Sequence, residues 1–332
     1  MLHTEKNRFL IIRLSSFGDV LLTTPVIKAI KSHHPNASIS FVVKPAFKVM
    51  IETHPEIDEI YLFNDSVLTE LQTKSFDVCI DLQNNQRSFW LTRKLSVQHS
   101  VRYKKDRLKR FLFMNFGYKK FNSPIRSVSQ KYVDTLAPLG ITSSDYSLDF
   151  FISDHTRNTP FPFFSENYIC IAPGAAHATK QWPKEHFVEL ISLLAKSYKI
   201  VLLGGPNETE TGDYILNNCS YVYNYIGKTH FQETALILEK AQLLICNDSS
   251  IMHLGVALKK KLLVFFGSTV EQFGFFPYET EAKVMENNTL SCRPCTHVGQ
   301  QKCPKKHFDC LNTLSAKNAF IEAKKLLECS SG

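Results

Sequence analysis

The stretch FLIIRLSSFGDVLLTTPVIKAIK (residues 9–31) holds a strand, a polar loop and the start of a helix in immediate succession. Its opening run of apolar residues is typical of a strand that is covered on both faces of a parallel sheet. Thr24 suits a helix N-cap and Pro25 suits the first helical position. The single carboxylate of the loop, Asp19, lies between the two elements, where it can cap a helix or carry out chemistry.

The same alternation of apolar strands and amphipathic segments continues through both halves of the chain. We expect strands at 9–14, 38–43, 57–63, 76–82 and 99–103, and again at 168–174, 199–205, 221–227, 241–248 and 261–267. Strands that alternate with helices and are continuously apolar predict parallel sheets with helices on both faces. Two such runs predict two doubly wound α/β domains.

Length and composition agree with this prediction. The chain has 332 residues, of which 44% are hydrophobic and 21% are charged, so it is globular and too long for one ordinary core. The segment 152–166 has two prolines and no clear period, which indicates a domain break. We therefore expect an N-terminal domain at 1–158, a C-terminal domain at 159–314, and a terminal helix at 315–332 that is available to pack back on the N-terminal domain.

The cellular compartment bears on the nine cysteines. No apolar run approaches the roughly 20 residues of a transmembrane helix, and the N-terminus lacks a secretory pattern, so we expect a cytoplasmic protein. Its cysteines would then be thiols or metal ligands rather than disulfides. Cys79, Cys170 and Cys246 lie in predicted strands and are expected in the core, whereas Cys219 and Cys329 stay unassigned.

Four further cysteines lie in the late segment CRPCTHVGQQKCPKKHFDC (292–310). Their spacing is C-x2-C-x7-C-x6-C, formed by Cys292, Cys295, Cys303 and Cys310. Four thiols this close can hold a tetrahedral structural metal, either zinc or iron, with His297 and His307 as substitute ligands. Since the second spacing is not that of a standard zinc finger, free or redox-active thiols are the alternative.

Two loops of the second half follow strands and suit a diphosphate. In APGAAHATKQWPKEHF (172–187), Lys180 lies in a glycine-containing loop, where an ammonium group can follow the charge on a leaving group. In NDSSIMHLGVAL (247–258), Asp248 and two serines enter a helix whose N–H groups and dipole attract phosphate. The plainer alternatives are a solvated lysine and an ordinary helix cap, and His253 either lies in the core or faces the diphosphate.

A third loop, LLGGPNETE (202–210), has two glycines after a strand, where a backbone can approach a nucleotide. It lacks the G-x-G-x-x-G pattern, so a dehydrogenase-type fold is not supported. The segment RYKKDRLKRFLFMNFGYKK (102–120) holds eight basic residues and one acidic residue, in a chain whose net charge is +8. It is either a solvated face or a contact for an anionic membrane surface or acceptor. Nucleic acid is not expected, because no known binding module accompanies it.

Together these segments resemble the heptosyltransferases, glycosyltransferase family 9, which move heptose from ADP-heptose onto the inner core of lipopolysaccharide. The motifs at 13–31, 172–187, 202–210, 247–258 and 292–303 occur in the order of the family and span most of the chain. The resemblance implies a GT-B fold of two facing Rossmann-like domains, with the acceptor on the first and the donor on the second. The late cysteines are most similar to members that add the second heptose, the type II enzymes.

The resemblance also implies residue roles. Asp19 would be the general base that takes the proton of the acceptor hydroxyl. The implied substrate-binding residues are Ser16, Gly18, Lys180, Asp248, Ser249, Ser250 and His253. The chain departs from the family at Ser250-Ile251, where Gly-Pro is usual, although a serine can still offer its N–H to a phosphate.

An inverting transfer needs only a base and positive charge around the diphosphate, and the chain has no D-x-D sequence, so no catalytic metal is expected. The expected partners are an ADP-sugar, an anionic lipopolysaccharide precursor and, through 102–120, the inner face of the inner membrane. One alternative is an epimerase of the same architecture, which needs more acids in the cleft and no lipid acceptor. Another is a non-catalytic nucleotide-sugar-binding module, against which the presence of Asp19, Lys180 and Asp248 together speaks.

Overall fold

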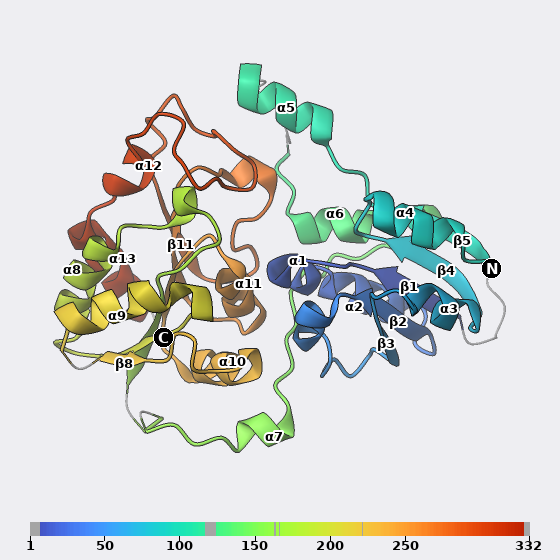
Figure 1. Cartoon of the computed structure of the whole chain (residues 1–332), viewed down its shortest axis with the longest axis horizontal. Helices are drawn as coiled ribbons and strands as arrows, with labels where there is room; N and C mark the ends of the chain where they lie inside the picture. Colours follow the sequence, from blue (N-terminus) through green and yellow to red (C-terminus); the bar gives the residue numbers. More distant parts are fainter. Residues whose placement is uncertain (1–6, 117–123, 163, 166, 221, 329–332) are drawn as a thin grey trace. The chain divides into compact units, whose positions relative to one another are not determined.

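The computed structural model describes residues 7–116, 124–162, 164–165, 167–220 and 222–328, which fall into two compact units (Figure 1). Unit 1 comprises the chain up to Arg107 together with Arg126–Phe151, and unit 2 comprises Leu108–Ile125 together with the chain from Ile152 onward. Residues 117–120 of the basic segment, Cys329 and the last residues of the predicted terminal helix lie outside the described residues.

Unit 1 is built on a five-stranded parallel sheet with the order β3-β2-β1-β4-β5. Its strands are β1 (Arg8–Ile12), β2 (Ser38–Val43), β3 (Glu59–Leu62), β4 (Phe76–Asp81) and β5 (Val97–Arg102). In the centre of the sheet, Phe9 of β1 lies opposite Ile39 of β2 and Val78 of β4. All five strands predicted for the first half are therefore confirmed.

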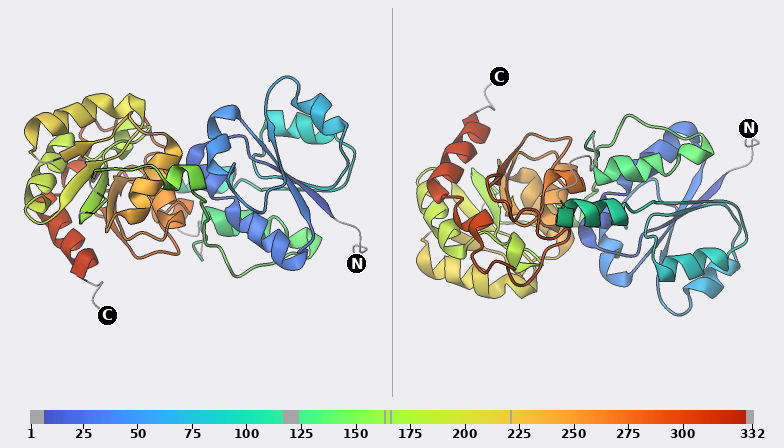
Figure 2. Two further views of the ribbon diagram at one scale, coloured as in Figure 1. Left: turned by 90° about the horizontal axis from the view of Figure 1, so that it is seen from below. Right: turned by 90° about the horizontal axis from the view of Figure 1, so that it is seen from above.

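The helices of unit 1 lie on both faces of its sheet (Figure 2). They are α1 (Phe17–Leu21), α2 (Thr24–His33), α3 (Val67–Gln72), α4 (Gln86–Arg93) and α6 (Val128–Asp134), with 3-10 turns η1 (Pro45–Met50) and η2 (Ala137–Leu139). Helix α2 begins at Thr24, and Thr23 is its N-cap. The predicted start, with Thr24 as the N-cap, is therefore confirmed to within one residue. The short helix α1, which holds Asp19, was not predicted.

Unit 2 has a six-stranded parallel sheet with the order β11-β10-β9-β6-β7-β8. Its strands are β6 (Tyr168–Ala172), β7 (Lys199–Leu202), β8 (Val222–Asn224), β9 (Leu244–Asn247), β10 (Leu262–Phe266) and β11 (Ala282–Glu286). The five predicted strands are confirmed, and β11 was missed. Strand β11 is an edge strand with charged side chains and no fully buried residue, so it lacks the apolar run that marks a central strand.

The helices of unit 2 include α5, whose residues from Leu108 onward belong to this unit. In order they are α5 (Arg107–Phe116), α7 (Asp154–Arg157), α8 (Lys184–Leu194), α9 (Thr209–Asn218), α10 (Phe231–Lys240), α11 (Ser250–Ala257), α12 (Asp309–Asn312) and α13 (Ala316–Glu328), with 3-10 turns η3 (Ala178–Lys180), η4 (Pro206–Glu208) and η5 (Glu271–Phe273). Within the described ranges, no helix is both long and apolar enough to cross a membrane.

The terminal helix α13 packs against other elements of unit 2, and its predicted packing on the N-terminal domain stays a prediction. It contacts α8, β10 and β11, and it buries Ala316, Ala319 and Ala323 in the core of this unit. The indole Nε1 of Trp182 donates a hydrogen bond of 2.9 Å to the carbonyl of Leu314, just before the helix. The small side chains on one face of α13 allow the helix to pack closely against α8, β10 and β11. The spacing of apolar residues in the sequence does not by itself predict this packing.

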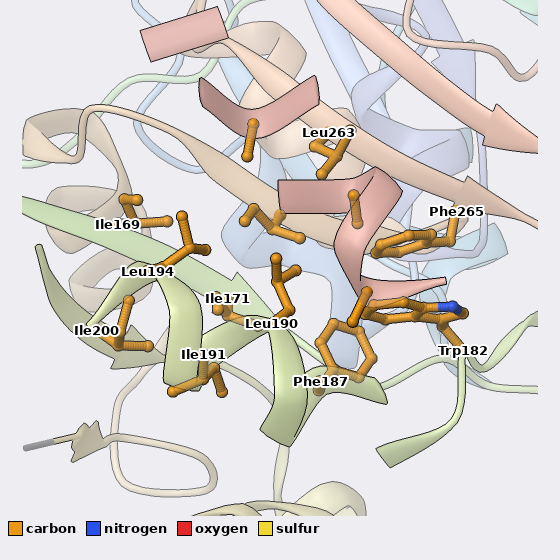
Figure 3. Packing of buried hydrophobic residues seen from close by; sticks show 14 of the residues in the cluster. Ile169, Ile171, Trp182, Phe187, Leu190, Ile191, Leu194, Ile200, Leu263 and Phe265 are labelled. Atoms are coloured by element: carbon orange, nitrogen blue, oxygen red, sulfur yellow. The ribbon is translucent and has the colours of Figure 1, made fainter. Parts of the chain in front are cut away.

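Aromatic stacking organises the core of unit 2 (Figure 3). The rings of Trp182 and Phe265 are stacked with 3.9 Å between centroids and 12° between planes, and Phe187 contacts both rings edge-on. Cys79, Cys170 and Cys246 are fully buried in their strands, which confirms the prediction that they are core residues. Trp182 directly follows the loop of Lys180, so the same packing anchors the end of that loop.

Truncation of Phe265 tests this core. We expect Phe265→Ala to lower the free energy of unfolding by about 3–5 kcal/mol, because it removes the stacked partner of Trp182 and leaves a cavity. Urea unfolding followed by circular dichroism measures the change. The control is Leu216→Ala on α9, which is 41% exposed and should change stability by no more than about 0.5 kcal/mol. Equal effects of the two substitutions would contradict the assignment.

Candidate functional site

The strand order of each sheet reverses at one place, between β1 and β4 in unit 1 and between β6 and β9 in unit 2. In doubly wound sheets, ligands bind outside the carboxyl ends of the strands at this reversal, because the loops diverge there. The loops in question begin at Arg13 and Leu82 in unit 1, and at Pro173 and Asp248 in unit 2. Each predicted catalytic or substrate-binding residue lies in one of these loops or in the helix that follows, whereas the four late cysteines lie after β11.

In unit 1, the carboxylate of Asp19 is paired with the guanidinium of Arg13. Nη2 of Arg13 lies 2.8 Å from Oδ2 of Asp19. The other nitrogens of this buried guanidinium donate 2.7 Å hydrogen bonds to the carbonyls of Ser15 and Leu82. Burial opposes the charge, but Tyr132 and Asp19 raise the pKa of Arg13 above its ordinary value. Arg13 is therefore a fixed cation at the reversal, and its role was not predicted from the sequence.

Asp19 also makes a capping contact at the start of α1. Its Oδ2 accepts hydrogen bonds from the backbone N–H and the hydroxyl of Ser16, at 3.3 and 3.0 Å. The capping role and a chemical role are thus compatible, because capping uses only Oδ2 and the Asp19 side chain remains 25% exposed. Gly18 is buried within α1, whereas Ser16 is exposed beside Asp19.

A second, fully buried carboxylate holds the loop after β4. Oδ1 of Asp81 accepts the backbone N–H groups of Gln83 and Asn84, at 3.0 and 2.8 Å. Oδ2 of Asp81 lies 3.0 Å from Nε of Arg102, and it also accepts the hydroxyl of Ser88. Gln83 in turn accepts the backbone N–H groups of residues 14 and 15 on its Oε1. The loops after β1 and β4 are therefore one hydrogen-bonded structure.

In unit 2, the structure brings together two of the predicted residues. Nζ of Lys180 lies 2.7 Å from Oδ2 of Asp248, and both side chains are largely buried. The hydroxyl of Thr269 donates a further 2.7 Å hydrogen bond to the same oxygen. The loops after β6, β9 and β10 thus converge on one buried carboxylate.

The helix after Asp248 begins as predicted. Ser249 is the N-cap of α11, and Ser250 is the first helical residue. The buried hydroxyl oxygen of Ser249 has no hydrogen-bond partner within the described residues. A buried hydroxyl without a partner beside free helix N–H groups suits an anionic ligand. His253 is buried one turn further along, with its ring 6.3 Å from that of Phe275.

Asn247, the last residue of β9, joins the two loops of unit 2 at the reversal. Its amide nitrogen donates to the carbonyl of Pro173 at 2.7 Å, and its carbonyl oxygen accepts the backbone N–H of Trp182 at 3.0 Å. These bonds fix both ends of the loop that carries Lys180. Asn247 is the first residue of the motif at 247–258, but its role was not predicted from the sequence.

The late cysteine segment is bonded directly to the Lys180 loop through Thr179. The backbone N–H of Thr179 donates to the carbonyl of Gln300 at 3.0 Å, and its hydroxyl accepts the N–H of Gln300 at 2.9 Å. The hydroxyl of Ser268 also donates to the Thr179 hydroxyl, at 3.0 Å. Gln301 adds a side-chain bond of 2.9 Å to the carbonyl of Ala176. The segment therefore forms part of the wall of the site.

A further carboxylate, Glu208, fills the space beside the loops after β6 and β7. A Cβ atom at Gly174 or at Gly204 would overlap with the Glu208 side chain. Burial raises the pKa of Glu208, although its oxygen accepts the N–H of Gly205 at 2.8 Å. Gly174 of the loop after β6 and Gly204 of the LLGGPNETE motif thus make room for a carboxylate, which was not predicted from the sequence.

The four late cysteines influence one another. Burial raises the pKa of Cys310 to about 11, and the three other thiols of the segment add to the effect. In the part of the chain that is described, no three or more His, Cys, Asp or Glu side chains form a group that could hold a metal ion. The thiols as they lie are neighbours but not a ligand set, so a structural zinc or iron at this segment stays a prediction.

A family model and a known relative both point to the heptosyltransferases. The model of glycosyltransferase family 9 (heptosyltransferase) matches residues 65–306. Lipopolysaccharide heptosyltransferase 3 of Escherichia coli K12 is 26% identical over 77% of this chain and 81% of its own length.

Two solved structures are similar over nearly their whole length. A family 9 glycosyltransferase from Veillonella parvula has a TM-score of 0.82 at 22% identity, covering 99% of each chain. The ADP-heptose lipopolysaccharide heptosyltransferase II of E. coli has a TM-score of 0.78 at 18% identity, covering 98% of this chain and 100% of the other. These likenesses confirm the predicted GT-B fold. The relatives include types 3 and II, so the comparisons do not distinguish the type.

Thiol reactivity tests the geometry of the cysteine segment. Burial would raise the pKa of Cys303, but backbone N–H groups at residues 305–308 bond to its sulfur, and the net effect lowers that pKa. Because the thiolate is the reactive form, we expect iodoacetamide at neutral pH to label Cys303 well before Cys310. Peptide mass spectrometry measures the order.

Two other outcomes are informative. Faster labelling of Cys310 than of Cys303 would contradict the described geometry. Slow labelling of all four cysteines that is relieved by a chelator, with zinc or iron found by elemental analysis, would establish the predicted metal.

Proposed function

Because the chain belongs to glycosyltransferase family 9, the heptosyltransferases, we propose that it transfers heptose from ADP-heptose to the inner core of lipopolysaccharide, as a type II enzyme. The observation that carries the proposal is the Lys180–Asp248 pair at the strand reversal of unit 2, beside the start of α11. A cation and a helix N-terminus at this point suit a nucleoside diphosphate. The late cysteine segment, which is similar to that of type II members, supports the finer assignment.

The donor diphosphate would compete with Asp248 for the ammonium group of Lys180. Without donor, the 2.7 Å ion pair balances both charges in a largely buried setting. With donor bound, Lys180 would turn to the phosphates and offset the charge that develops on departing ADP. Asp248 would then be available to accept hydrogen bonds from hydroxyl groups of the heptose. Ser249 and the N–H groups of α11 would bind the phosphate oxygens.

Glu208 is the residue that we assign to the ribose of the donor. It lies just after β7, the strand next to β6 in the sheet. In nucleotide-binding sheets of this order, an acidic side chain beyond the second strand accepts ribose hydroxyl groups. Its raised pKa would still leave a carboxylate or a carboxyl group that can hydrogen-bond to a hydroxyl.

Asp19 is the residue that we assign as general base. Oδ2 is held by Arg13 and Ser16, whereas Oδ1 has no partner among the described residues. The acceptor oxygen would attack the anomeric carbon of heptose as the bond from that carbon to the diphosphate breaks. The proton of the acceptor hydroxyl would pass to Oδ1, and ADP would leave with the bonding electrons. Arg13 holds the carboxylate in place.

We place the enzyme at the cytoplasmic face of the inner membrane, where a lipid-linked acceptor is available. The basic segment supports this through α5, on which Leu108 is 71% exposed and Phe111 is 53% exposed. These apolar side chains alternate with exposed Arg107 and Lys109. Such a helix suits a surface that combines acyl chains with anionic groups.

Asp19→Asn tests the assignment of the base. We expect transfer to fall by about 10²-fold or more, because the amide cannot accept the proton, while the dissociation constant of ADP-heptose changes only a few-fold. Release of ADP in the presence of a truncated lipopolysaccharide acceptor measures the first quantity, and titration calorimetry measures the second. Asp65→Asn, at an exposed carboxylate of unit 1, is the control. Full activity of Asp19→Asn would remove Asp19 from the mechanism.

Lys180→Ala tests the donor half. We expect a loss of about 10²-fold or more in kcat together with weaker donor binding, since the developing charge on ADP loses its cation. Lys180→Arg keeps the charge and should recover part of the rate. Turnover of ADP-heptose that does not depend on acceptor would instead favour an epimerase or a hydrolase. Donor binding without turnover in the unmodified protein would favour a binding module.

A further inference from the structure

Helix α4 of unit 1 presents large aromatic side chains to solvent. Trp90 is 61% exposed and Phe89 is 36% exposed, and their rings contact each other edge-on with 6.0 Å between centroids. The guanidinium of Arg93 lies over the Phe89 ring at 5.6 Å, and that of Arg102 at 4.9 Å. Exposed tryptophan on a rigid helix is costly in water and indicates a contact surface.

The exposure of these rings follows from how α4 is anchored. Ser88, Leu91 and Thr92 are buried and fix the inner face of the helix. Asn85 and Ser88 form a reciprocal capping box with two bonds of 3.0 Å, and the Ser88 hydroxyl also bonds to buried Asp81. The helix therefore cannot roll to bury Trp90 without breaking these bonds.

The surroundings of the two rings are basic. Arg87, Arg93 and Lys94 are exposed, and none of them forms an ion pair with an acidic side chain within the described residues. The whole segment 82–105 contains six lysines and arginines and no aspartate or glutamate. An isolated solvated helix would gain from acidic residues spaced to pair with these cations. Their absence over 24 residues indicates a partner that carries negative charge.

We propose that the outer face of α4, formed by Arg87, Phe89, Trp90, Arg93 and Lys94, docks on the surface of a bilayer that contains anionic phospholipids. Indole rings favour the headgroup region, where one edge is apolar and the other is wet. Lysine and arginine are attracted by the negative surface potential of such a bilayer. The outer face of a helix is convex, whereas sites for sugars and other small ligands are concave. The surface is formed by other residues than the α5 contact assigned above, and its proposal does not depend on the transfer reaction.

The two tryptophans of the chain make the test direct. Trp182 is 2% exposed, so the emission that iodide or acrylamide can quench comes from Trp90. The experiment uses the full chain with vesicles of three parts phosphatidylcholine to one part phosphatidylglycerol, and with vesicles of phosphatidylcholine alone. On the anionic vesicles we expect a blue shift of the emission, loss of quenching and co-sedimentation. These changes should be small on the neutral vesicles and should weaken with salt.

Variants separate the contributions. We expect Trp90→Ala, and separately Arg87→Glu with Arg93→Glu, to weaken partition onto anionic vesicles by about tenfold or more. Trp90→Phe should retain most of the binding but abolish the spectral shift. The matched controls are Leu216→Ala and Lys317→Glu, at exposed positions of unit 2, which should bind as the unmodified protein does. Circular dichroism and unfolding curves confirm that each variant is folded.

Three results would overturn the proposal. One is equal partition of the α4 variants and the controls. Another is unchanged vesicle binding with a raised KM for a soluble, delipidated acceptor, which would make Trp90 part of a glycan site. The third is a change in oligomeric state with Trp90→Ala and no vesicle dependence, which would assign the face to a second copy. Since none of the binding measurements requires turnover, failure of the proposed reaction would leave this test unaffected.

Discussion

The candidate site of each unit depends on the reversal of strand order in its parallel sheet. At that point two adjacent loops leave the sheet in opposite directions, and an amide side chain ties them together in each unit. Gln83 bonds to the loop after β1 in unit 1, and Asn247 bonds to both ends of the Lys180 loop in unit 2. An amide suits this task because it donates and accepts without charge, so it leaves the electrostatics of the loop to other residues.

Those electrostatics follow one pattern in both units. The carboxylate assigned to chemistry or to sugar binding is matched with one cation, Arg13 for Asp19 and Lys180 for Asp248. The two pairs differ in what holds the cation. The guanidinium is fixed by two backbone carbonyls and keeps its raised pKa, so it can only position its partner. The ammonium group is a mobile point charge, which suits exchange between Asp248 and a diphosphate.

The sequence was informative where a local pattern determines the structure. Ten strands were predicted because each has an apolar run, and the start of α11 was predicted because Ser249 and Ser250 are cap residues. Strand β11 lacks an apolar run, and the packing of α13 depends on alanines matched to a distant surface. Arg13, Gln83, Asn247 and Glu208 could not be singled out for a related reason. Each has at least one contact with a residue far along the chain, such as Arg13 with Leu82 and Gln83 with Leu14, both 69 positions apart. No single-sequence pattern marks such pairs.

The bonds between Thr179 and Gln300 also have a consequence for biosynthesis. The Lys180 loop belongs to the middle of the chain, but several of its hydrogen-bond partners lie much later, at residues 268 and 300–301. Because translation proceeds from the N-terminus and domains fold as units, this loop cannot reach its final arrangement until the cysteine segment has emerged from the ribosome. Unit 1 has its sheet complete much earlier, at residue 102. A nascent chain therefore completes the sheet that carries Asp19 long before the Lys180 loop can adopt its final arrangement.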